Sequence, residues 1–580
     1  MEPAPEAERL DEPYDVQGQR PFRPWALAAA TLAAAVGAFV APDAWPAGAG
    51  AITVELRGVT AIESPVTVGD TTPLRLRGEA RGAKVTVELP DGIPVDAPVE
   101  AGIRVERAGS TVRPRLDALK LEIVLPGGAR ELVPAVRWDA AEKQLDARRR
   151  PPVDSAIVLA LLGAVVVLWV TELFPLFVTS LAIPVVLVLS RVADAPAAVE
   201  PFFSPIIVLF FAGFLMAQAM RRTGLDRLAA LSIVARAGRT PALLFAAMLC
   251  VAAFLSMWMS NTAAVAVLVP IAIAVTEPLH HLGYRKAVVL GIAYAGTIGG
   301  VGSAIGTPAN QLAIEFLDTF AGRSISFVEW FAFGLPLVIL FLPVMGVYLW
   351  WRSGVTVDPD GFRQARLEAQ DELARLGRPT RDQWLVLAVF GGVVAGWLTQ
   401  TAHGVHPGIV ALAGAVVLAM LRKITPEDLG RISWASLLTF GGGLTLGLFL
   451  VETGTSDWVA TRLTGLADVP SLVAASIVVV LALGLTTVAS NTAAAAILIP
   501  LALPLAGVLG IDPVLLVTVV AIATSIDFAL VIGTPPTLIA YSTGLYTAGR
   551  IFRVGIVLDA VGLLLLVTAV VAIWRLLGIV

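Results

Sequence analysis

One polar tripeptide recurs inside two apolar segments, and it constrains the fold more than any other feature of this 580-residue chain. Ser-Asn-Thr stands at 260–262 within SNTAAVAVLVP and again at 490–492 within SNTAAAAILIP, 230 positions later. At the same offset, Gly213 matches Gly443. A repeated spacing of this kind indicates an internal duplication, so we expect the chain to fold as two related halves.

Both tripeptides lie in a chain that is too apolar for a soluble domain. Hydrophobic residues make up 57% of it and charged residues 15%, with a mean hydropathy of +0.81, whereas soluble domains carry about 25% charged residues. The sequence therefore predicts an all-α polytopic membrane protein with about 11 transmembrane helices, because about 20 apolar residues cross a bilayer as a helix. The predicted spans lie near residues 25–42, 155–173, 176–191, 205–221, 287–305, 327–350, 383–400, 406–421, 433–451, 513–531 and 554–577.

Several classes of function are disfavoured by the same sequence. No G-x-x-x-x-G-K-[ST] stretch is present to cradle nucleotide phosphates, and the metalloprotease pattern H-E-x-x-H is absent. A net charge of −4 without a basic tract argues against nucleic-acid binding. Cys250 is the only cysteine, which excludes an intramolecular disulfide. We expect no enzyme, because the apolar segments carry no credible set of acid, base or metal ligands.

Residues 43–152 differ from the rest, because apolar and polar residues alternate there with period two, as in AITVELRG and AKVTVELP. Turn-forming residues separate these stretches, which is typical of short strands. We expect a small extracytoplasmic β-sandwich domain. The acidic leader before the first span argues against a cleaved signal peptide. The predicted organisation is a cytoplasmic leader at 1–24, a first transmembrane span at 25–42, the β-rich domain at 43–152, a first inverted repeat at 153–351, a cytoplasmic linker at 352–382 and a second inverted repeat at 383–580.

Each tripeptide separates two short apolar arms, in the segments 241–279 and 471–509. This pattern is typical of a re-entrant hairpin whose tip lies at mid-membrane, where it must face protein or a wet cavity. Lys and Arg in the connecting segments predict a cytoplasmic N-terminus, with the β-rich domain and the C-terminus extracytoplasmic. Each half then has an odd number of crossings, so the two halves are inverted relative to each other, as in secondary transporters.

A second repeated break follows each hairpin. Gly-Thr-Pro stands at 306–308 and again at 533–535, 227 positions later. Proline removes a backbone donor and glycine relaxes the backbone, so we expect the helix to unwind at both places. Unwinding frees carbonyl oxygens, which suit a hard cation such as Na⁺, and half-helix N-termini, which favour an anion. Asn261 and Asn491 each offer an acceptor and two donors, so one side chain can face both ions.

These motifs, together with LWVTELFPLFVTSLAIP at 168–184, closely resemble the divalent anion/Na⁺ symporter family over about residues 155–580. The resemblance implies an elevator-type homodimer, in which a transport domain holding two hairpins slides against a scaffold. It also implies a transporter of dicarboxylates, citrate or sulfate in the cell (inner) membrane, coupled to Na⁺ and using no organic cofactor.

The resemblance also implies roles for individual residues. The substrate-binding residues would be Asn261, Thr262, Thr307, Asn491, Thr492 and Thr534. One Na⁺ site would comprise Ser256, Ser260, Asn261 and the backbone of Gly306, and its symmetry mate Thr486, Ala489, Asn491 and the backbone of Gly533. The second break departs from the family pattern, because Val531 replaces a proline and Thr537 an asparagine. The same break holds Asp527, and an intramembrane carboxylate is by default a functional candidate. It is either a coupling residue or a structural hydrogen-bonding group.

We expect the chain to couple Na⁺ influx to the uptake of a small divalent anion, a C4-dicarboxylate such as succinate. A Na⁺-independent dicarboxylate exchanger and a sulfate transporter stay open as alternatives within the family. A membrane receptor that binds its ligand through the β-rich domain is a remoter alternative, since it leaves the repeated tripeptide unexplained. The expected partners are the divalent anion, Na⁺, membrane lipid and a second copy of the chain, and no nucleic acid.

Overall fold

The computed structural model describes residues 28–34, the strands between 51 and 149 by their backbone alone, and 152–579 with short gaps. The predicted leader at 1–24 and most of the predicted first span lie outside the described residues. The gaps are at 238–239, 355–366, 368–369, 372, 464–468 and 532.

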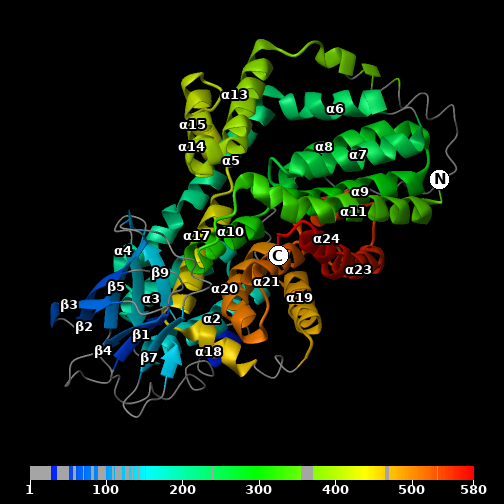
Figure 1. Cartoon of the computed structure of the whole chain (residues 1–580). Coiled ribbons are helices and arrows are strands. Elements are labelled where there is room, and N and C mark those ends of the chain that lie inside the picture. The colour runs from blue at the N-terminus through cyan, green and yellow to red at the C-terminus, as the bar shows by residue number, and fades with distance from the viewer. Residues whose placement is uncertain are drawn as a thin grey trace.

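The described strands form two antiparallel sheets, which gather at one end of the helical part in Figure 1. The strand orders are β4-β1-β7-β8 and β3-β2-β5-β10-β9, with β6 paired to β5. In the first sheet, Ile52 lies opposite Val87 on one side and Ile123 on the other. The strands are β1 (Ala51–Glu55), β2 (Ala61–Val68), β3 (Thr71–Glu79), β4 (Lys84–Glu88), β5 (Val99–Arg107), β6 (Ser110–Thr111), β7 (Lys120–Val124), β8 (Arg130–Leu132), β9 (Ala135–Asp139) and β10 (Gln144–Arg149).

The rest of the described chain is helical, and we call residues 153–351 the first half and 383–580 the second half. Many helices begin with proline, whose fixed φ and missing donor suit the first helical position. The first half contains α2 (Pro152–Thr171), α3 (Leu176–Leu189), α4 (Ala195–Val199), α5 (Pro205–Thr223), α6 (Leu225–Ala237), α7 (Pro241–Ser256), α8 (Asn261–Thr276), α9 (Leu282–Gly299), α10 (Pro308–Ala321) and α11 (Phe327–Ser353). The second half contains α13 (Arg381–Leu398), α14 (Gln400–His403), α15 (Pro407–Met420), α16 (Pro426–Leu429), α17 (Trp434–Glu452), α18 (Thr455–Arg462), α19 (Ser471–Val488), α20 (Asn491–Leu509), α21 (Pro513–Ala523), α22 (Pro535–Ser542), α23 (Ala548–Leu565) and α24 (Val571–Leu576).

The predicted fold class needs correction. Among the described residues, 6 helices rather than about 11 are long and apolar enough to cross a membrane. Several predicted spans are helices of 10–17 residues, which at about 1.5 Å per residue are shorter than a hydrocarbon core of about 30 Å. The predicted β-sandwich is not retained in the fold class either: the fold that the structure supports is a helical transporter, and the strands between 51 and 149 are described by their backbone alone, as two antiparallel sheets. The six long helices are Val153–Thr171, Ala195–Thr223, Phe327–Ser353, Trp434–Glu452, Asn491–Leu509 and Ala548–Leu576.

The helices pack in two groups, which meet where α17 packs on α20. In one group, α3 packs on α17, α5 on α15, and α13 on α15. In the other, α7, α8 and α11 pack on α9, while α20 packs on α10 and α21. The two halves interlock in this second group, because α22 of the second half packs on α8 and α9 of the first. Figure 1 shows the second group running from α7 through α9 and α11 to α23.

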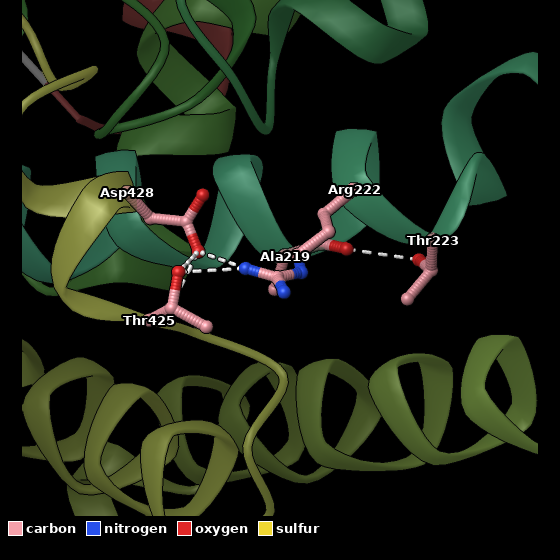
Figure 2. A network of polar contacts seen from close by, with 5 residues as sticks. All are labelled: Ala219, Arg222, Thr223, Thr425 and Asp428. Carbon is pink, nitrogen blue, oxygen red and sulfur yellow. Dashed lines mark hydrogen bonds and ion pairs between the residues drawn. The ribbon is translucent and has the colours of Figure 1, made fainter.

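A polar network fixes the end of α5 against the second half (Figure 2). The Arg222 guanidinium donates to Thr425 Oγ1 at 2.6 Å and to Asp428 Oδ2 at 3.1 Å. The same Asp428 oxygen accepts from the backbone N–H of Thr425 at 2.8 Å. Burial alone would raise the pKa of Asp428, but the hydrogen bonds from Thr425 and Arg222 outweigh it and hold that pKa below its ordinary value. The network therefore anchors α5 to α16.

Candidate functional site

Both Ser-Asn-Thr tripeptides form helix N-termini at a hairpin tip. The Oγ of Ser260 caps α8 by accepting from Ala263 N, and the Oγ of Ser490 caps α20 by accepting from Ala493 N. Serine is a favoured capping residue because its oxygen satisfies one of the free amides of the first turn. Since both serine oxygens serve as caps, the asparagine that follows each begins the helix.

Both Gly-Thr-Pro motifs also form helix N-termini. Thr307 precedes α10 and Thr534 precedes α22, each in extended backbone conformation with proline at the first helical position. Glycines on later helices let the chain pack closely behind each break. A Cβ on Gly334 of α11 would overlap the carbonyl of Val301, and one on Gly555 of α23 would overlap that of Phe528. The breaks predicted from the sequence are present in both halves.

One cavity of about 780 Å³ joins the four N-termini. Its lining includes the residues at the tips of α8 and α20 and the residues before α10 and α22. No Lys or Arg belongs to the described lining, and Glu172 is the charged residue in it. Each helix N-terminus carries unpaired amides and the equivalent of about half a positive charge, so the cavity suits an anion. All six predicted substrate-binding residues line it: Asn261, Thr262, Thr307, Asn491, Thr492 and Thr534.

Two matched phenylalanines lie in the wall of this cavity. Phe210 of α5 and Phe440 of α17 are 230 positions apart in sequence, and their rings stack with centroids 5.0 Å apart. When a residue packs against its own equivalent, the axis that relates the two halves passes between them. The cavity is therefore bounded by both halves around that axis.

The first predicted Na⁺ site is a cluster of oxygens. Ser256 Oγ lies 2.6 Å from Asn261 Oδ1 and 2.5 Å from the carbonyl oxygen of Gly296. A Cβ at Gly300 would lie 2.5 Å from Asn261 Oδ1 and 2.8 Å from the carbonyl oxygen of Gly306, so only glycine fits this cradle. Neutral oxygens of this kind are suitable ligands for a hard cation. Ser260, the fourth predicted member, is used as the cap of α8.

Asn310 holds the first break together, a role that the sequence did not reveal. Its side chain is fully buried. Its Nδ2 lies 3.1 Å from the carbonyl oxygen of Gly300, 3.3 Å from that of Val301 and 2.7 Å from that of Ser303. Its Oδ1 has no hydrogen-bond partner among the described residues. This orphaned acceptor beside the oxygen cluster fits a cation-binding site.

The second predicted Na⁺ site repeats the first with a threonine in place of the serine. Thr486 Oγ1 lies 2.9 Å from Asn491 Oδ1 and 2.7 Å from the carbonyl oxygen of Thr524. Of the other predicted members, Ala489 is buried and Gly533 lines the cavity. These oxygen ligands again fit a hard cation, and in each predicted site the hydroxyl (Ser256 or Thr486) lies beside the asparagine oxygen.

The second break is held differently from the first. Thr537, the equivalent of Asn310, makes a hydrogen bond to the Thr534 hydroxyl at 2.9 Å and has no amide with which to tie carbonyls. Asp527 is fully buried and lies against Gly533, where a Cβ would overlap its carboxylate. Val531, in the place of the family proline, lies in a turn of this break. The sequence departures therefore fall at one place in the structure.

Comparison with known proteins decides the family. A model of the sodium:sulfate symporter transmembrane region matches residues 152–580. The chain belongs to this symporter family. The predicted membership in the divalent anion/Na⁺ symporters is thereby confirmed, and the chain is an integral membrane protein of a transporter family.

Two relatives within the symporter family carry a functional name. The sodium-dependent dicarboxylate transporter SdcS of Staphylococcus saprophyticus is 30% identical over 444 residues, covering 71% of this chain and 85% of the relative. SdcS of Staphylococcus aureus is 29% identical over 451 residues, covering 72% and 86%. Among solved structures, the YdaH transporter of Alcanivorax borkumensis aligns with a TM-score of 0.44 and 15% identity, covering 67% of this chain and 90% of that one.

Proposed function

We propose that this protein couples Na⁺ influx to the uptake of a small divalent anion, a C4-dicarboxylate such as succinate. The observation that carries the proposal is the cavity, in which four helix N-termini meet and the described lining contains no Lys or Arg. A substrate with two carboxylates can place one at the N-termini of each half. Two oxygen clusters flank the cavity, so cations bound there would offset the charge of the anion. The names of the SdcS relatives support the same substrates.

Coupling follows from this arrangement. Cation and anion would bind within one cavity wall, and Asn261 and Asn491 face both because each amide has an oxygen and two N–H groups. Each bound ion then raises the affinity for the other, which is a reciprocal coupling free energy. The substrate-binding roles of Thr262, Thr307, Thr492 and Thr534 rest on their hydroxyl groups in the cavity lining.

The transport motion is proposed to be an elevator in a homodimer. The helices α7–α11 and α19–α24 would move as one body against α3, α5, α13, α15 and α17. A contrast between matched glycines supports this. A Cβ on Gly443 of α17 would lie 2.7 Å from the Cβ of Ala496 in α20, whereas one on Gly213 of α5 would meet nothing within 4 Å. The second-half hairpin is thus closed against α17, while the matching wall of α5 borders the cavity.

This contrast supports one of the two states that the proposed motion requires. In the orientation expected from the basic segments, with the N-terminus cytoplasmic and the C-terminus extracytoplasmic, the open wall is on the cytoplasmic side. The conformation is then inward-open. In the outward-open state, Gly213 would pack against Ala266 of α8, the residue equivalent to Ala496, and the wall at Gly443 would open.

Uptake into proteoliposomes tests the function. Purified protein is reconstituted, and labelled succinate is offered with an inward Na⁺ gradient or with choline in its place. We expect accumulation only with Na⁺, competed by fumarate and malate more strongly than by sulfate. Uptake that requires internal dicarboxylate but no Na⁺ would assign the protein as an exchanger, and stronger competition by sulfate would assign it as a sulfate transporter. The absence of any dianion transport would contradict the proposal.

A further inference from the structure

Asp527 is a buried carboxylate without a described partner. Its side chain has 0% exposure, and neither of its oxygens has a hydrogen-bond partner among the described residues. The other buried carboxylate nearby, Asp559, accepts a hydrogen bond of 2.8 Å from Phe528 N. An unpaired buried charge is strongly unfavourable for folding unless something compensates it. The charge of Asp527 must therefore be either lost by protonation or offset by a bound cation, and the Na⁺ titration below distinguishes the two.

The position of Asp527 in the duplicated fold indicates where such a cation would bind. With the offset of 227 that relates the two Gly-Thr-Pro motifs, Asp527 is equivalent to Gly300. Gly300 borders the first oxygen cluster, since a Cβ there would lie 2.5 Å from Asn261 Oδ1 and 2.8 Å from the carbonyl oxygen of Gly306. Where the first half has a glycine facing Gly306, the second half has a carboxylate packed on the equivalent Gly533.

Apart from Asp527, the groups around the second cluster are neutral oxygen atoms that can ligate a cation. Thr486 Oγ1 and the carbonyl oxygen of Thr524 lie within 2.7 Å of each other, and Asn491 Oδ1 lies 2.9 Å from the same hydroxyl. Ser525 Oγ is also buried without a partner among the described residues. Within the described part of the chain neither oxygen of Asp527 has a hydrogen-bond partner, so both are available to a bound cation.

We propose that the Asp527 carboxylate is a ligand of the Na⁺ held by the second cluster. This inference rests on the proposed function, because it takes the two oxygen clusters as the Na⁺ sites. It makes the sites unequal: the first is built from neutral oxygens, whereas the second carries its own negative charge. The second site therefore binds Na⁺ in the absence of the anionic substrate. The first needs the anion to offset the charge of its cation.

Na⁺-dependent thermal stability without any dicarboxylate tests this inequality. The purified full-length protein is titrated with NaCl against N-methylglucamine chloride at constant chloride, and its melting is followed by tryptophan fluorescence. We expect Na⁺ to raise the melting temperature of the wild type. Asp527→Asn and Asp527→Gly, the residue of the first half, should each raise the half-saturating Na⁺ concentration at least tenfold. Asp559→Asn keeps an oxygen for Phe528 N and is the matched control, with an expected change below twofold.

Each outcome is decisive. In Na⁺-free buffer both Asp527 variants should be at least as stable as the wild type, because they no longer bury an unpaired charge. A variant with an unchanged Na⁺ response, or the failure of both variants to fold, would overturn the role of Asp527 as a ligand. Uptake assays keep the two proposals apart: Na⁺-driven uptake with an unchanged Asp527→Asn titration rejects this inference alone. A wild type with neither Na⁺ stabilisation nor Na⁺-driven uptake rejects the proposed function itself.

Discussion

The two broken helices begin alike and are held by different means. In the first half, the two N–H groups of the buried Asn310 amide are shared among three carbonyl oxygens of the break, those of Gly300, Val301 and Ser303. In the second half, Thr537 reaches only the neighbouring Thr534, and the space beside Gly533 is filled by the Asp527 carboxylate. The duplicated fold thus preserves the helix N-termini that line the cavity, while the groups behind them diverge. Under the proposed function, the two halves share the surface that faces the anion and differ in the surfaces that face the cations.

The largest expected effect comes from the residues that the two halves share. Asn261→Ala and Asn491→Ala each remove one cation-facing oxygen and two N–H groups at a hairpin tip. We expect each to lower succinate uptake by about 100-fold or more, because a buried site with unmade hydrogen bonds loses several kcal/mol. The measurement is initial uptake at equal protein content. Folded, monodisperse protein on gel filtration is the control, and uptake near that of the wild type would refute the assigned site.

The next largest effect is expected from exchanging the residues at 310 and 537, which hold the two breaks in different ways. Asn310→Thr gives the first half the residue of the second, and it leaves three buried carbonyls without their donor. We expect a loss of about 3 kcal/mol in unfolding free energy, seen as a lower melting temperature, together with loss of uptake. Thr537→Asn is the reciprocal change and should alter the melting temperature far less. Equal effects of both substitutions would mean that the breaks are held in the same way.

The matched glycines test which wall is closed. Gly443→Ala would press on Ala496, and overpacking of this kind costs about 1–3 kcal/mol, which shifts the protein away from the observed state by about 5- to 150-fold. Gly213→Ala should leave the observed state unstrained and oppose the other one. Labelling of single cysteines introduced at the cavity wall, in a Cys250→Ser background, reports the two populations. If both variants shifted the two populations in the same direction, the proposal that α17 and α5 pack against their hairpins in alternate states would be contradicted.

The smallest effect is expected at the anchor of α5. Arg222 is half exposed, so Arg222→Ala should lower stability by about 1 kcal/mol or less. The Asp428 carboxylate has a pKa below its ordinary value in the folded protein. Its contribution to stability is therefore present above the unfolded pKa of about 3.9 and is lost as the pH falls through the lower, folded pKa. Melting curves of wild type and Asp428→Asn should differ at pH 7 and converge in acid.

Sequence reasoning located the parts of the site that obey local rules. The helix breaks at the two Gly-Thr-Pro motifs were predicted, because proline geometry depends on only a few neighbouring residues, whereas the capping roles of Ser260 and Ser490 were not. The offsets of 230 and 227 then paired these elements across the two halves. The family followed from the same residues. The hairpin tips, the helix breaks and the family could be predicted because each depends on a short stretch of sequence.

What the sequence did not reveal depends on contacts between distant or unwound segments. The three bonds of Asn310 span the interior of a break whose path no propensity specifies. The contact of Asp527 with Gly533 needs a particular turn at Val531. The number of full-length spans was overestimated, because hydropathy measures how apolar a segment is and not whether it continues as one helix. In this fold several apolar helices end after fewer than the about 20 residues that cross a bilayer, at Ser256 and Ala523 among others.

The four helix N-termini that line the cavity have one further consequence, which concerns acidity. Backbone amides do not titrate, and a helix dipole has no protonation state to lose. An anion held by them meets the same attraction at pH 5 as at pH 8, unlike an anion held by histidine. The helix N-termini would then add no pH dependence to binding, and the anion would add its own through the fraction that carries both charges. A cavity whose electrostatic attraction does not change with pH therefore selects the charge state of the anion that it binds.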